Sequence, residues 1–171
     1  MLCVVSVFAF VSCGEGKKNQ VNTSEQSSVG ENEESDGAWF MAQTDVAPVQ
    51  TVSATSELVE AKFAGKYLYP PINILDGNFR TTWCEAVDGD GIGESVTVEF
   101  TEPVSFDEIQ IVNGFATRES FAINNRIKKI TITQVAGEHF QQKEYELADN
   151  VMGWQSIKFE LPQTAKTIEL K

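Results

Sequence analysis

The sequence predicts an all-β fold, a sandwich of two sheets, for the chain from residue 51 onward. Two observations predict it. Polar and apolar residues alternate in several segments rich in Val, Ile, Thr and Phe, which is typical of strands with one buried face. Turn-forming residues separate these segments, and no amphipathic pattern long enough for a three-turn helix appears. A chain of 171 residues with 42% hydrophobic residues is long enough to build one domain with a core.

The expected strands follow one another along the second half of the chain. They are SVTVEF (95–100), FDEIQIVN (106–113), IKKITITQV (127–135), QQKEYELA (141–148), WQSIKFEL (154–161) and AKTIELK (165–171). Turns are expected at TEPVS, NGFATRES, AGEHF and DNVMG. This makes about six or seven strands, fewer than the eight of a complete jelly roll, so we expect the sandwich to lack its last strand or strands.

The first residues predict export. MLCVVSVFAFVSCG is an apolar run too short to span a bilayer, which takes about 20 residues, but long enough for the core of a signal peptide. Its end, from Phe10 to Gly14, resembles a bacterial lipobox, although Phe10 stands where Leu is usual and no basic residue precedes the run. The resemblance implies that residues 1–13 are a signal peptide, that Cys13 is acylated, and that the protein is lipid-anchored in the bacterial cell envelope, at the outer membrane or the cell surface.

Residues 14–50 predict a disordered acidic tether. They are rich in Ser, Asn, Gln and Glu and hold few apolar residues, so they cannot bury enough surface to offset the entropy of ordering. The exception is the apolar group Trp39, Phe40 and Met41, which we expect either to pack on the edge of the domain or to form a short binding motif.

Charge and cysteine content exclude some functions. A net charge of −12 argues against nucleic acid as a partner, because phosphate binding needs clustered Lys and Arg. The three cysteines, Cys3, Cys13 and Cys84, do not form an even disulfide framework.

The acidic, glycine-rich run that follows Trp83 leaves three interpretations open. An EF-hand count from Asp88 fails because Ile92 stands at the fifth position and cannot ligate, although an irregular oxygen-ligand site is an alternative. A carboxylate pair for glycoside hydrolysis is a second alternative, but acids this dense in a turn are usually solvated. The third is a loop, shaped by glycines, that presents Trp83 either to a sugar or to the core. We expect no catalytic residues, no metal and no cofactor.

Several motifs occur in order at consistent spacing: INILDGNFRTTWCEAVDGDGIGESVTVEF, then IQIVNGF, then NNRIKKITIT. With them, residues 53–171 resemble a discoidin-like, galactose-binding-type jelly-roll β-sandwich, and more narrowly the glycan-binding domain class of bacterial lipoproteins and of the translocation domain of a streptococcal NAD-glycohydrolase toxin. The resemblance implies non-catalytic glycan binding. It also implies a further strand pair past residue 171, with a DTC.SE-like segment that would hold the partner of Cys84, so that Cys84 is unpaired here.

The expected ligand-binding residues lie in the loops at one end of the sandwich. Arg126 is also a candidate for a structural ion pair with an acid such as Glu85. The alternatives to glycan binding are a host or envelope protein bound by the same loops, and a truncated fragment without function. The full set of candidate ligand-binding residues is Trp83, Glu85, Asn113, Asn125 and Arg126.

Overall fold

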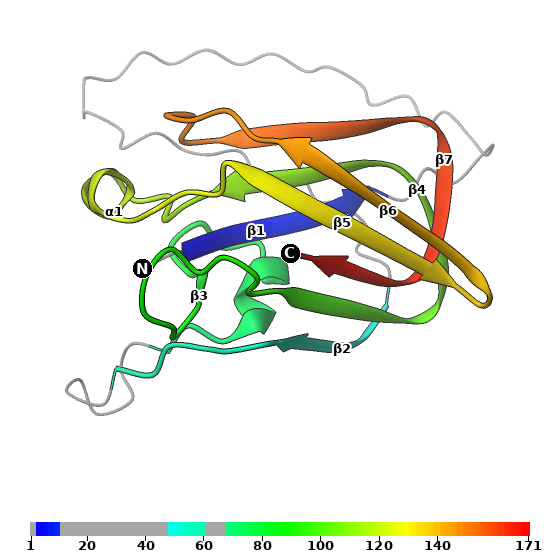
Figure 1. Ribbon diagram of the computed structural model, residues 1–171, viewed down its shortest axis with the longest axis horizontal. Coiled ribbons are helices and arrows are strands. Elements are labelled where there is room, and N and C mark those ends of the chain that lie inside the picture. Colours follow the sequence, from blue (N-terminus) through cyan, green and yellow to red (C-terminus); the bar gives the residue numbers. More distant parts are fainter. Residues whose placement is uncertain (1–2, 11–47, 61–67) are drawn as a thin grey trace, which may run out of the picture.

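The computed structural model describes residues 3–10, 48–60 and 68–171, and of residues 3–10 only the backbone. It confirms the all-β prediction (Figure 1). In chain order the elements are β1 (Cys3–Phe10), β2 (Val49–Ala54), the 3-10 helix η2 (Pro71–Leu75), β3 (Trp83–Cys84), β4 (Val96–Asn113), α1 (Arg118–Ile123), β5 (Lys129–Ala136), β6 (His139–Glu146) and β7 (Trp154–Leu170).

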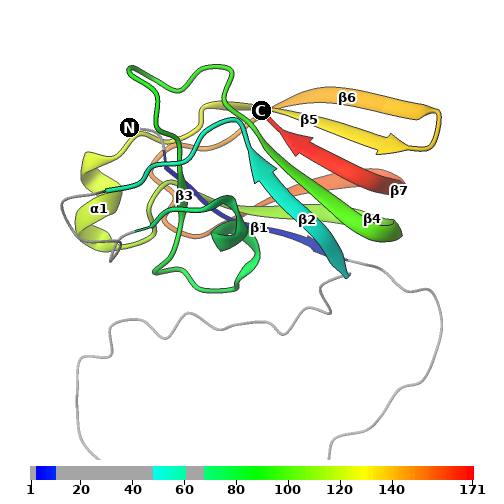
Figure 2. The same cartoon turned by 90° about the horizontal axis from the view of Figure 1, so that it is seen from below.

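All strand pairs are antiparallel, in the order β3-β1-β4-β7-β5-β6, and β2 pairs with β4 off this path. The sheet folds over on itself because β4 and β7 bend and take part in both layers (Figures 1 and 2). One layer holds β2, the first part of β4, the last part of β7, β5 and β6. The other holds β3, β1, the last part of β4 and the first part of β7.

The continuity of β4 corrects one predicted boundary. The turn expected at TEPVS is a bend within a single strand of 18 residues. The β4–β7 register shifts between Glu99 and Val104, so that Pro103 lies where no ladder bond to β7 is needed. A second bend inside β7 joins the two expected strands 154–161 and 165–171 in the same way.

The core lies between the layers and follows the alternation of the strands. Ile109 and Ile111 of β4, Ile130 and Ile132 of β5 and Phe106 at the bend are at most 1% exposed. This burial is the main stabilising contribution, about 25 cal/mol per Å² of apolar surface. The helix α1 is short, with six residues, and is capped by Thr117, whose side chain accepts a hydrogen bond from the Ser120 N–H.

The strand β1 lies in the segment that was predicted to be a signal peptide. It pairs with β4 from Val4 to Phe10 and with β3 at Cys3 and Val4. A segment that is removed on export is not a strand of the mature domain, so the two assignments exclude each other. Cys13, residues 14–47 of the expected tether and the Trp39–Met41 group lie outside the described residues. The expected end of the tether at residue 50 is wrong, because Val49 and Gln50 already belong to β2, which pairs with β4. Within the described part of the chain, no helix is long and apolar enough to cross a membrane.

Candidate functional site

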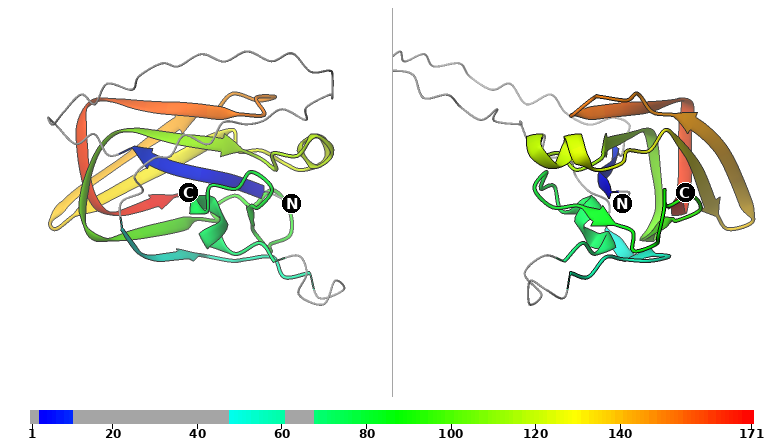
Figure 3. Two further views of the ribbon diagram at one scale, coloured as in Figure 1. Left: turned by 180° about the vertical axis from the view of Figure 1, so that it is seen from behind. Right: turned by 60° about the vertical axis from the view of Figure 1, so that its left-hand side comes forward.

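The loops that carry the predicted site residues gather at one end of the sandwich, around α1 and β3, while the β5–β6 hairpin turn points to the other end (Figures 1 and 3). They follow β3 and β4 in the chain, the second of them on both sides of α1. The topology therefore brings the predicted site residues to one end of the sandwich, as expected.

Trp83 and Glu85 lie in the interior. Trp83 is 2% exposed, belongs to the core cluster and donates its indole N–H to the Ser56 carbonyl at 2.8 Å. Glu85 is 1% exposed, and its carboxylate accepts the Val87 N–H at 2.7 Å. The structure thus places Trp83 in the core, the second of its two predicted uses.

Asn113 clamps two segments together. Its amide is fully buried, accepts the Ile127 N–H at 2.8 Å and donates to the Ile127 carbonyl at 2.7 Å. It therefore fixes the segment that follows α1, at Ile127, to the end of β4. Its side chain satisfies both backbone groups of one residue, as a neighbouring strand would.

Arg126 has a structural partner, but not the predicted one. Its Nε donates to the Asp149 carboxylate at 2.6 Å, so the expected pairing with Glu85 is wrong. The reason is that Glu85 is buried in the loop that follows β3. Asp149, in the loop that follows β6, lies next to Arg126. The guanidinium also donates to the Phe121 carbonyl at 2.7 Å and stacks over the Phe121 ring at 4.6 Å.

Asn125 is the predicted site residue whose side chain is exposed. The ligand-binding role of all five residues stays a prediction, and four of them are held by the structural contacts above.

The acidic, glycine-rich loop is organised by one of its acids. Glu94 accepts hydrogen bonds from the hydroxyls of Ser56 and of Thr55, the latter at 2.7 Å, and these bonds lower the pKa of its carboxyl below the usual value. Gly89 and Gly93 have φ of +100° and +97° and allow the sharp reversal. Among the described residues, no three His, Cys, Asp or Glu side chains come close enough together to hold a metal ion.

Sequence analysis did not predict the aromatic pair at this end. Phe79 and Trp154 meet edge to face with ring centroids 5.2 Å apart, and Trp154 is 36% exposed. A shallow hollow beside them is lined by Phe79, Trp154, Val112, Ala116, Met152 and Gly153. The two residues are 75 positions apart: Phe79 lies in the loop between η2 and β3, and Trp154 begins β7, so only the tertiary fold brings them together. The one local signal was a Trp at the boundary between a turn and a strand.

Cys84 also differs from expectation. It is disulfide-bonded, not unpaired, and Cys3 stands opposite it in the β1–β3 register. The partner was expected past residue 171, whereas the register places Cys3 of the N-terminal strand β1 opposite Cys84.

The chain resembles known proteins in sequence and in fold. The family model described as the NAD glycohydrolase translocation F5/8 type C domain matches residues 43–171. Among curated proteins, none matches. The solved structures with this fold include the family 32 carbohydrate-binding module of Clostridium perfringens NanJ in complex with galactose. It is 21% identical, the match covers 70% of this chain and 79% of that chain, and the TM-score is 0.55.

Another is CpGH89CBM32-5 from the same organism, in complex with GalNAc-β-1,3-galactose. It is 19% identical over 70% of this chain and 81% of that chain, with a TM-score of 0.54. At these identities the likeness establishes a shared fold.

Proposed function

The chain belongs to the family of NAD glycohydrolase translocation F5/8 type C domains, and from this premise we propose that it binds glycans without transforming them, at the surface of a bacterial cell. The two solved structures described above are carbohydrate-binding modules, and each holds a galactose-containing sugar. We place the glycan at the loop end of the sandwich.

The Phe79–Trp154 pair is the observation that carries the proposal. An exposed aromatic face packs against the apolar C–H face of a sugar, while nearby polar groups bond the hydroxyls. Trp154 offers such a face, and Asn125 and Asp149 supply exposed polar groups at the same end. Trp83, in contrast, is buried and supports the loops from below.

The lipid anchor belongs to the same proposal. The lipobox-like end of the N-terminal run supports acylation of Cys13, and the polar segment between Cys13 and β2 would let the domain extend from the membrane. Holding the domain at the envelope raises the effective concentration of weak sites.

Calorimetric titration with galactose and with GalNAc-β-1,3-galactose tests the proposal. We expect saturable binding that weakens about tenfold, ~1.4 kcal/mol, in Trp154→Ala, because the stacking face is removed. Phe140→Ala is the matched control: Phe140 is 64% exposed at the hairpin near the opposite end, so binding should not change. Equal loss in both variants, or hydrolysis of a chromogenic glycoside or of NAD by the purified protein, would contradict the proposal.

A further inference from the structure

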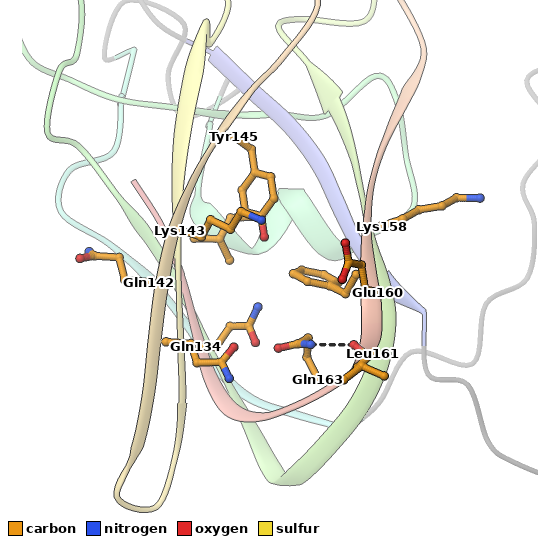
Figure 4. A pocket seen from close by; sticks show the side chains of 11 residues that line it. Gln134, Gln142, Lys143, Tyr145, Lys158, Glu160, Leu161 and Gln163 are labelled. Carbon is orange, nitrogen blue, oxygen red and sulfur yellow. Dashed lines mark hydrogen bonds between the residues drawn. The ribbon is translucent and has the colours of Figure 1, made fainter.

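A groove of about 570 Å³ lies on the open side of the sandwich (Figure 4) and shares no lining residue with the hollow beside the Phe79–Trp154 pair. It separates the β5–β6 hairpin from the middle of β7. β6 is the last strand of one layer, and the first half of β7 is the last strand of the other, so no further strand closes this side in the described part of the chain. The volume lies within the range of ligand pockets, about 300–1,000 Å³.

Gln134 is the residue that marks the groove as a site. It follows Ile130 and Ile132 on the core face of β5, where the alternation calls for another apolar side chain, and it is 6% exposed. Its carboxamide has no hydrogen-bond partner among the described residues, whereas a buried amide is normally bonded. Figure 4 shows it turned into the groove. A ligand in the groove would satisfy it.

Other amides face the same space. Gln141 stands opposite Gln134 in the β5–β6 register, and Gln163 reaches in from β7, where its Nε2 donates to the Leu161 carbonyl at 2.6 Å. A carboxamide both donates and accepts, which matches a sugar hydroxyl, since that group also does both.

Aromatic rings close one end of the groove. Tyr145 of β6 and Phe159 of β7 meet edge to face at 6.2 Å across the two layers, and Phe159 rests on Phe106 at 5.6 Å. The Tyr145 hydroxyl is protonated at neutral pH, like any phenol, and burial raises its pKa further, so it can donate a hydrogen bond. Together the rings give a rigid apolar wall beside the polar amides.

We propose that this groove is a second carbohydrate site, which holds a neutral oligosaccharide chain along β7 with Gln134, Gln141 and Gln163 on its hydroxyls. The inference rests on the proposed glycan-binding function and extends it. The charged side chains of the lining are Lys143, Lys158 and Glu160, which nearly balance and so favour a neutral ligand over a polyanion. The lining follows β7 from Lys158 to Gln163, which favours a chain over a single sugar.

The test separates the two sites. The protein labelled with ¹⁵N is titrated with neutral galacto-oligosaccharides from disaccharide to hexasaccharide, and the side-chain amide signals of Gln134 and Gln163 are followed. We expect them to shift with the hexasaccharide in the wild type and equally in Trp154→Ala. Gln134→Leu should weaken this binding about three- to tenfold. It should also raise Tm by about 2–4 °C, because an unmet buried amide is removed.

Gln142→Ala is the matched control. Gln142 borders the groove next to Gln141 on β6, but its side chain donates to Thr133 at 3.3 Å and points to the outer side of β6 in Figure 4, so binding should be retained. Sugar binding that shifts only signals around Trp154 would overturn this inference and leave the proposed function standing. No sugar binding at either site would overturn both. Shifts of β6 backbone amides with an extended peptide, and none with the sugars, would assign the groove to protein partners and overturn the inference.

Discussion

At the scale of single residues, the loop end is held by buried polar groups with specific partners. Asn113 replaces strand pairing for Ile127 by bonding both its N–H and its carbonyl. Removing the amide leaves these two backbone groups without their partner in a half-buried place, which is more costly than the loss of an exposed hydrogen bond.

We therefore expect Asn113→Ala to lower the free energy of unfolding by about 1–3 kcal/mol, measured by urea denaturation. Asn125→Ala, at an exposed position twelve residues further on, should change it by less than about 0.5 kcal/mol. If the Asn113 variant were as stable as the Asn125 variant, the clamp would contribute nothing and Asn113 would be free for a ligand role.

The ion pair between Asp149 and Arg126 predicts a pH dependence. The hydrogen bond from Arg126, and next the Asn150 N–H, lower the pKa of the Asp149 carboxyl in the folded state. A lowered folded pKa stabilises the fold above the unfolded value of about 3.9, and this contribution is lost as the pH falls through the folded pKa.

Asp149→Asn should therefore have a lower Tm than the wild type at pH 7, and the difference should shrink below about pH 4. Thermal unfolding between pH 7 and pH 3 measures it, with Glu138→Gln at the exposed hairpin turn as a control. A Tm difference that is constant with pH would show that the carboxylate is not the group responsible.

At the scale of elements, the passage from β4 to α1 depends on one glycine. Gly114 has φ of +89°, and a Cβ there would meet Arg126 Cγ at 2.7 Å. Gly137 in the β5–β6 turn also has positive φ, +61°, but open space around it. Both positions strain an L residue, and only Gly114 adds a clash.

We expect Gly114→Ala to destabilise the protein by about 1–3 kcal/mol. Gly137→Ala should destabilise it by less, because it strains only the backbone and its new Cβ meets no other atom. Equal losses of stability in chemical denaturation would show that Arg126 moves aside without cost. The Gly114 variant should also lose the Arg126–Asp149 pair, and with it the pH dependence described above.

Sequence patterns predict some of these elements and not others. Alternation predicts the strands because the period of two is a local property, so the segments around Val98, Ile111 and Ile132 were placed correctly. It does not distinguish a bend inside a strand from a turn, as at Pro103. Nor does it distinguish a buried Trp83 from an exposed Trp154, because both adjoin strands and burial depends on which layer covers each. The groove around Gln134 could not be predicted from the sequence, because its lining comes from three strands, β5, β6 and β7, whose register no single segment shows.

At the scale of the whole molecule, the N-terminal segment is either a strand of the domain or a signal peptide that is removed, and it cannot be both. As β1 it lies between β3 and β4, with Cys3 opposite the disulfide-bonded Cys84. As a signal peptide it leaves the protein, and the edges of β3 and β4 lose their neighbour. The family match begins at residue 43 and so does not include this strand.

We expect export to prevail in a bacterium that makes the chain with its own N-terminus, because the apolar run and Cys13 are presented to the export machinery before β4 is synthesised. The protein should then sediment with membranes, and its intact mass should begin at an acylated Cys13. Cys13→Ala should release it from the membrane, while Cys3→Ala should leave anchoring unchanged. A water-soluble protein that keeps Met1, and whose Cys84 is cross-linked to a peptide containing Cys3, would instead establish β1 as a strand of the mature fold.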